Sequence, residues 1–158
     1  MGRCRMTVKI NSGNQNKKRR INLSKTEKAA EAALKALGRD NIELNIMFLS
    51  NQKIRALNRA YLHTDKATDV IAFPPGDGTG KGKRKGEKGR FFLGDIAISS
   101  DKAAGNARAY GMTFMEEIVL YVIHGTLHLM GYRDATEKSR NAMRKKENEV
   151  LQKVRRYL

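Results

Sequence analysis

The chain has 158 residues, a length at which one compact domain can bury its own core without disulfides or a partner chain. Its 32 Lys and Arg residues against 16 Asp and Glu give a formal net charge of +16. This charge indicates a polyanionic partner, nucleic acid first and an anionic membrane surface second; a merely basic protein without a specific site is the alternative. The only cysteine, Cys4, excludes an intrachain disulfide and a Cys-rich zinc module and fits a reducing cytosol.

The hydropathy of the chain argues against export and membrane insertion. The first residues lack the apolar segment of a signal peptide. No apolar run approaches the ~20 residues that cross a bilayer. We therefore expect a cytoplasmic protein with no membrane partner, organised as a single domain over residues 1–158.

The N-terminal part of the chain predicts a strand followed by a helix. Residues 6–10 alternate apolar and polar side chains, as a short strand does, and the polar, basic residues 11–20 predict a loop. Ser24 and Glu27 stand at the spacing of a capping box, before an apolar helical stripe that Gly38 ends.

A second strand and helix follow, and then a third strand. Ile42 to Leu49 is an apolar run that predicts a strand, and Ser50 is placed to cap a helix that includes Tyr61. The apolar, partly β-branched run from Asp69 to Phe73 predicts a short strand, which the adjacent Pro74 stops.

The composition changes abruptly over Gly76 to Arg90. These residues include six glycines and six Lys or Arg and no apolar side chain, so burial cannot offset the entropy of ordering them. The sequence therefore predicts a mobile loop within the domain. We expect the cations of this loop to contact RNA phosphates. The alternative is a solvated linker. The cations are Lys81, Lys83, Arg84, Lys85, Lys88 and Arg90.

The C-terminal part predicts one strand and three helices. The strand covers residues 91–98 with an interruption at Gly94-Asp95, and Ser99 or Ser100 caps a helix that continues through Tyr110. Thr113 and Glu116 form a capping box that opens a helix to about Met130, which is apolar nearly all round and so central. The last helix, from about Thr136, is charged with a thin apolar line and so lies on the surface.

These elements predict an α+β fold. We expect a small mixed β-sheet of about four strands flanked on both faces by about five helices, with the histidine-bearing helix of residues 113–130 at the centre.

Two histidines of that central helix are candidate metal ligands. His124 and His128 are four residues apart, so their side chains lie on one face about one turn apart. Buried imidazoles are costly unless their nitrogens are satisfied, by a shared ion or by hydrogen bonds within the core. Gly131 can end the helix and turn the chain back, which brings Asp134 within reach as a third ligand.

The spacing matches that of the metzincin zinc site, His-Glu-x-x-His-x-x-Gly-x-x-His, with two replacements. Gly125 stands where those proteases have their general-base Glu, and Asp134 stands where they have the last His. Three protein ligands from imidazole and carboxylate leave a fourth position open, as in catalytic zinc sites. One Zn²⁺ per chain is therefore expected, and the missing Glu argues against proteolysis.

Residues 124–132, His-Gly-Thr-Leu-His-Leu-Met-Gly-Tyr, resemble the His-Gly-x-Leu-His-Leu-x-Gly-Tyr signature of the YbeY family of bacterial endoribonucleases and ribosomal RNA maturation factors. Residues 68–74 are similar to that family's Thr-Asp-Val-Leu-Ser-Phe-Pro, and residues 57–61 and 93–96 resemble its preceding helix and following strand. The resemblance spans roughly residues 42 to 151. It implies single-strand-specific, zinc-dependent RNA cleavage in small-subunit rRNA processing and ribosome quality control, with ribosomal RNA and the ribosome or its proteins as partners.

The sequence departs from the family pattern at two positions. The third ligand is commonly His in the family and is Asp134 here. An Arg that is implicated in activity follows the Tyr of the second helix in the family, and Leu62 occupies that position here. Arg59 or Lys66 are candidates to supply the charge instead.

The sequence does not identify the general base or the nucleophile. Bound zinc lowers the pKa of its water to about 7 and polarises a phosphoryl oxygen, and the attacking group is either that water or the neighbouring 2′-hydroxyl. Asp69 is a candidate catalytic acid or base, whereas Asp95 is better interpreted as a structural residue. A ribosome-assembly factor with a structural metal and a zinc hydrolase of another substrate are the alternatives to a ribonuclease.

Overall fold

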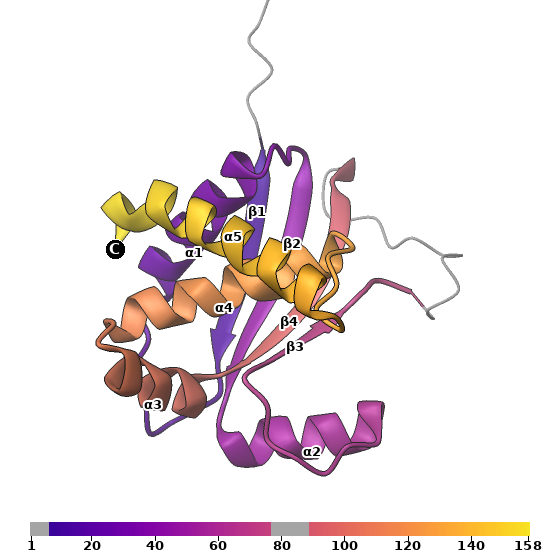
Figure 1. The fold of residues 1–158 in the computed structure, drawn as a ribbon, viewed down its shortest axis with the longest axis vertical. Coiled ribbons are helices and arrows are strands. Elements are labelled where there is room, and N and C mark those ends of the chain that lie inside the picture. The colour runs from indigo at the N-terminus through magenta and orange to yellow at the C-terminus, as the bar shows by residue number, and fades with distance from the viewer. Residues whose placement is uncertain (1–6, 77–88) are drawn as a thin grey trace, which may run out of the picture.

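The computed structural model describes residues 7–76 and 89–158. Strands and helices alternate along the first half of the chain, and three helices follow the last strand (Figure 1). In chain order the elements are β1 (Val8–Asn14), α1 (Leu23–Ala36), β2 (Ile42–Leu49), α2 (Asn51–Leu62), β3 (Val70–Phe73), β4 (Phe91–Ser99), α3 (Ser100–Tyr110), α4 (Phe114–Leu129), α5 (Glu137–Val154) and the 3₁₀ helix η2 (Arg155–Tyr157).

The four strands form one mixed sheet in the order β1-β2-β4-β3. Strands β1, β2 and β4 are parallel, and β3 pairs antiparallel with β4 at one edge. Strand β1 is longer than predicted, because residues 11–14 continue its pairing with residues 45–48 of β2. The expectation that residues 11–20 form a loop is therefore wrong at its start, where parallel pairing overrides the polar composition.

Helices lie on both faces of the sheet, as predicted, but most of the helical mass is on one. Figure 1 shows α4 crossing the strands, with α5 stacked upon it. On the other face α2 packs by Ile54 against Ile71 and Ala97. Side chains of successive strand residues alternate between faces, so Ile96 and Ile98 belong to the core beneath α4 while Ala97 meets α2.

Helix α4 begins where the capping box predicted it. The Thr113 hydroxyl accepts a hydrogen bond from the Glu116 amide at 3.1 Å, and the Glu116 carboxylate accepts one from the Thr113 amide at 3.2 Å. One side of the helix packs on the sheet, and another packs through Val119, Ile123 and Leu127 on α1 and α5. This burial on several sides fixes α4 as the central helix of the fold.

Two local expectations are corrected by packing. Asn22, not Ser24, caps α1, and its side-chain oxygen accepts the Lys25 amide at 3.0 Å. The helix starts earlier because Leu23 packs against the main core cluster. Strand β4 is not interrupted at Gly94 but carries a bulge there, since Phe92 pairs with Glu43 and Gly94 with Leu44.

Candidate metal centre

The C-terminal end of α4 places the two histidines on one side of the helix. Gly131 adopts φ +100° just beyond the helix, and its amide donates to the His128 carbonyl at 3.0 Å. The next amide, of Tyr132, donates to the Leu127 carbonyl at 3.0 Å. This turn reverses the chain as the sequence predicted and carries Asp134 back toward the imidazoles.

The nitrogens and the carboxylate oxygen converge on one point. His124 Nε2 and His128 Nε2 are 3.1 Å apart. Asp134 Oδ2 lies 3.4 Å from His128 Nε2 and 3.9 Å from His124 Nε2. Zinc–ligand bonds of about 2.0–2.1 Å in tetrahedral geometry place neighbouring ligand atoms about 3.3 Å apart, so the observed separations fit one such ion.

The site is open on one side. Each imidazole is 28% exposed and the Asp134 carboxylate is 49% exposed. His124, His128 and Asp134 form a group that can hold a metal ion, and no second group of this kind occurs within residues 7–76 and 89–158. Three ligands with a solvent-facing side leave room for a substrate or water at a fourth position.

The outer ring nitrogens determine which face each histidine presents to the ion. His124 Nδ1 is hydrogen-bonded to a carboxylate oxygen of Glu147, and His128 Nδ1 to the Tyr132 carbonyl at 3.1 Å. Both partners are acceptors, so each Nδ1 carries the hydrogen and each Nε2 directs a lone pair inward. The two Nε2 atoms are 3.1 Å apart, so a proton or a metal cation between them can be held by both.

Glu147 is the His124 partner that sequence reasoning missed. It lies on α5 and is only 9% exposed. The sequence does contain a signal for it, since Glu147 interrupts the apolar line of α5 between Met143 and Val150. A lone carboxylate within a buried stripe requires a partner, and here the partner is His124.

The acids around His124 alter its protonation. Burial disfavours the imidazolium, but the hydrogen bond and charge of Glu147, together with the charges of Asp69 and Asp134, outweigh it and raise the pKa of His124. The same negative surroundings that favour a proton on His124 favour a metal cation in its place.

Gly125 is where a general-base Glu would stand, and no side chain fits there. A Cβ at this position would lie 2.9 Å from Ile96 Cγ2 and 3.0 Å from Val70 Cγ1. The residue faces the sheet, at ~100° around the helix from His124 and ~60° from His128. The lack of a Glu at position 125 therefore follows from the close approach of α4 to the strands.

We expect Gly125→Ala to destabilise the fold by about 1–2 kcal/mol, because overpacking costs about 1–3 kcal/mol and the better helix propensity of alanine returns at most ~1 kcal/mol. Urea unfolding measures this change. Gly105→Ala in α3 is the control, since nothing lies within 4 Å of a Cβ there and the substitution should stabilise the fold. Equal effects of the two substitutions would contradict the packing argument.

The structure places Asp69, a catalytic candidate, and Asp95, interpreted as structural, on different sides of the sheet. The Asp69 carboxylate accepts the Val70 amide at 2.8 Å and lies close enough for its charge to act on His124. Asp95 is on the opposite face of the sheet, where it accepts from Asn45 at 3.0 Å. Only Asp69 is therefore near the metal ligands.

Arg59 and Lys66 are both exposed, on and after α2. A hollow beside His128 is lined by residues of α2 and β3, among them Asn58 and Leu62 but no lysine or arginine of the described chain. Leu62 stands where the motif that the sequence resembles has an Arg. It borders the hollow next to His128. Neither predicted substitute cation lines this hollow.

Most of the predicted RNA-contacting cations lie outside the described residues, namely Lys81, Lys83, Arg84, Lys85 and Lys88. Arg90 is described and is half-buried immediately before β4. Within the described ranges, no helix combines the length and apolar character that a bilayer-spanning helix needs.

Comparison with known proteins identifies relatives of the chain over most of its length. A family model described as Endoribonuclease YbeY matches residues 11–155. The Endoribonuclease YbeY of Aquifex aeolicus is 40% identical over 143 residues, which cover 90% of this chain and 90% of that protein. The one of Geobacter sulfurreducens is 34% identical over 146 residues, which cover 91% and 94%.

A solved structure shares the fold. The solution structure of a Thermotoga maritima protein superposes with a TM-score of 0.58 at 27% sequence identity, covering 94% of this chain and 89% of that one. The match of the family model to most of the chain, together with the relatives of 34–40% identity, establishes the family. The chain therefore belongs to the YbeY family of endoribonucleases.

Proposed function

We propose that the protein is a zinc-dependent endoribonuclease that cleaves single-stranded RNA in small-subunit rRNA maturation and ribosome quality control in the cytoplasm. The observation that carries the proposal is the convergence of His124 Nε2, His128 Nε2 and Asp134 Oδ2 on one solvent-facing point. Family membership supports the endoribonuclease activity, and the formal charge of +16 supports an RNA partner.

The residues of the site have separable tasks in this proposal. His124, His128 and Asp134 would hold the ion, which when bound supplies a Lewis acid for the scissile phosphodiester. Glu147 orients His124 and fixes its tautomer. Asp69, whose charge acts on His124, is our candidate for holding or moving a proton on the attacking group.

The hollow next to His128 is the proposed place for the nucleotide beside the scissile bond. It has a volume of about 270 Å³ and is lined by polar and apolar side chains, among them Asn58, Thr68 and Leu62. Arg59 and Lys66 stay candidates for contacting RNA phosphates from outside this hollow, as do the cations of residues 81–90.

Removal and return of the metal test the proposal. The protein is stripped with a chelator, reloaded with Zn²⁺, and incubated with single-stranded and duplex RNA. We expect cleavage of the single strand that disappears on stripping and returns on reloading. Elemental analysis should give one zinc per chain in wild type and less in Asp134→Ala.

Two results of that experiment would sink the proposal. A reloaded protein that binds RNA without cutting it, and whose metal only raises the melting temperature, would be an assembly factor with a structural metal. Cleavage of esters or peptides without cleavage of RNA would indicate a zinc hydrolase of another substrate.

We expect Leu62→Arg to increase RNA cleavage, by about tenfold, because it places a guanidinium in a hollow that has no described cation. Leu62 is 54% exposed, so the substitution should not disturb the core. Steady-state kinetics on a short single strand measure the gain. Leu62→Gln, which adds polarity without charge, is the control; a gain of the same size there would contradict the charge argument.

A further inference from the structure

A second basic surface lies away from the metal centre, at the N-terminal end of α4. The turn between β1 and α1 carries four consecutive cations, Lys17 to Arg20. Lys18, Arg19 and Arg20 line a hollow together with Arg108 of α3, a residue 88 positions further along the chain from Arg20. The fold thus brings Arg108 next to the cations of the β1–α1 turn, which are distant from it in the sequence.

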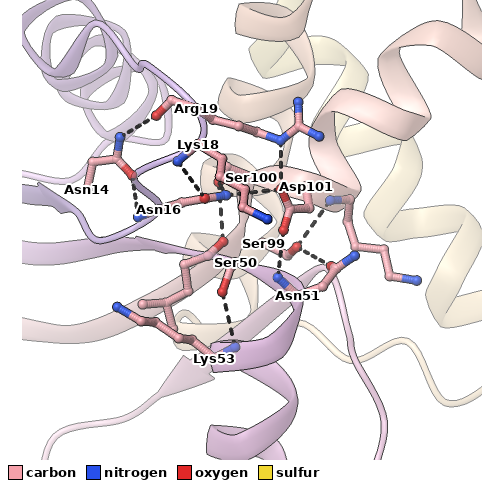
Figure 2. Close-up of polar contacts among 12 residues, drawn as sticks. Asn14, Asn16, Lys18, Arg19, Ser50, Asn51, Lys53, Ser99, Ser100 and Asp101 are labelled. Carbon is pink, nitrogen blue, oxygen red and sulfur yellow. Dashed lines mark hydrogen bonds and ion pairs between the residues drawn. The ribbon is translucent and has the colours of Figure 1, made fainter.

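The basic turn is held in place by hydrogen bonds to the start of α3, as Figure 2 shows. Asn16, only 3% exposed, donates to Ser100 Oγ at 2.8 Å and to Asp101 Oδ1 at 3.0 Å. Its own side-chain oxygen accepts the Lys18 amide at 3.3 Å, and Asn14 donates to the Arg19 carbonyl at 2.8 Å. The turn is therefore preorganised, which lowers the entropy that a ligand must remove on binding.

The acid that pairs with this basic turn, Asp101, has several donors. Asp101 is paired with Arg19 at 2.7 Å and also accepts the Asn51 amide at 2.8 Å. Burial disfavours the charged carboxylate, but these donors outweigh it and lower the pKa of Asp101. In contrast, Lys18, Arg20 and Arg108 form no ion pair with any residue that the structure describes.

The hollow joins these cations to an apolar floor. Its volume is about 390 Å³, within the ~300–1,000 Å³ that small-ligand pockets occupy, and its floor includes Ala107, Met112 and Phe114. Cations beside apolar and aromatic surface match the two parts of a nucleotide, the phosphate and the ribose with its base. An acidic protein partner could pair with the cations, but its acidic side chains would make no apolar contacts with the floor of the hollow.

The distance between the basic hollow and the candidate metal centre determines whether one RNA strand can contact both. Phe114 and His124 are ten residues apart on one helix and His128 lies four further, so they are about 15–21 Å apart along α4 at ~1.5 Å per residue. Because α4 is buried on several sides, an RNA strand must follow a longer path over the surface, and stacked nucleotides spaced by ~3.4 Å need at least about four to six units to cover it. One RNA strand can therefore reach both.

We propose that this hollow is a second RNA-binding site, in which Lys18, Arg20 and Arg108 bind backbone phosphates of a single strand at least about four to six nucleotides from the bond that is cut. The inference rests on the proposed ribonuclease function. It adds that an RNA strand long enough to reach both sites binds more tightly than a shorter one. The separation exceeds the ~8–10 Å Debye length of physiological salt, so these cations contribute to RNA binding and not to the chemical step.

The test compares two triple variants of the metal-loaded protein that lose the same charge. The first is Lys18→Gln with Arg20→Gln and Arg108→Gln. The matched control is Lys28→Gln with Arg39→Gln and Lys153→Gln, three exposed cations that do not line the hollow. Fluorescence anisotropy measures binding of a 2′-O-methyl single strand about twelve nucleotides long, which keeps every phosphate and resists cleavage, over a range of salt concentrations. Melting temperatures confirm that both variants are folded.

We expect the first variant to bind about tenfold or more weakly than the control and to reduce the slope of log K against log salt by about 2, at ~0.7 per phosphate contact on single strands. On a cleavable strand of the same length its KM should rise with kcat unchanged, whereas a dinucleotide substrate should show no difference. Equal binding by the two variants would overturn the proposal in favour of another occupant. Binding without cleavage by wild type would refute the ribonuclease function alone, and no binding by wild type would refute both.

Discussion

Replacement of His128 by alanine is expected to reduce kcat/KM for RNA cleavage by about 10³-fold or more while leaving RNA affinity within about threefold. His128 Nε2 lies 3.1 Å from His124 Nε2 and 3.4 Å from Asp134 Oδ2. The substitution therefore removes the proposed ligand atom that is nearest to both of the others. Loss of a residue that only orients a metal ligand already costs about 10–100-fold, and loss of a ligand costs more. RNA affinity should persist because it depends on cations that lie elsewhere.

The matched control for this substitution is His63→Asn. His63 is exposed, ends α2 in the left-handed conformation at φ +56°, and is not one of the metal-binding group. Asparagine tolerates that conformation better than alanine does, so the fold should be unaffected. Cleavage by His128→Ala at the wild-type rate would refute the catalytic role of the site, whatever the control shows.

Replacement of Glu147 by alanine should weaken metal binding by about 10–100-fold. The carboxylate accepts the hydrogen of His124 Nδ1, holds the ring with Nε2 toward the ion and supplies negative charge that favours a cation. Titration against a chelator of known affinity measures the change, and cleavage should recover largely when metal is added in excess.

Two further variants separate orientation from charge. Glu147→Gln keeps an acceptor for Nδ1 but loses the charge, so its metal affinity should lie between wild type and Glu147→Ala. Glu149→Ala removes an exposed acid of the same helix, whose only described ion pair is with Lys146, and should leave the affinity unchanged. An alanine variant at position 147 that binds metal as tightly as wild type would contradict the assignment.

The grouping of His124, His128 and Asp134 could be predicted because their arrangement is local. A spacing of four residues puts His124 and His128 on one side of any α-helix, and Gly131 marks the reversal that returns Asp134. The capping box at Thr113 and Glu116 is equally local and was predicted at the correct residues. In each case the determining contacts span at most ten residues of sequence.

The features that sequence reasoning missed depend on contacts between distant segments. Glu147 meets His124 only because α5 packs on α4, and its position in the apolar stripe was the single available signal. Leu62 borders the hollow at His128 because α2 and β3 meet there. Likewise, residues 11–14 become strand only through pairing with β2. Pairing and packing of this kind cannot be derived from composition or periodicity.

The exposed position of Asp134 has a consequence for the evolution of the metal centre. His124 and His128 follow directly after Ile123 and Leu127, which are both fully buried in α4, so changes there are constrained by folding. Asp134 lies on the connection to α5 and is exposed, so we expect exchange between carboxylate and imidazole at this position to leave the scaffold unchanged. A single substitution can therefore shift ion preference, since carboxylate suits harder cations and imidazole softer ones.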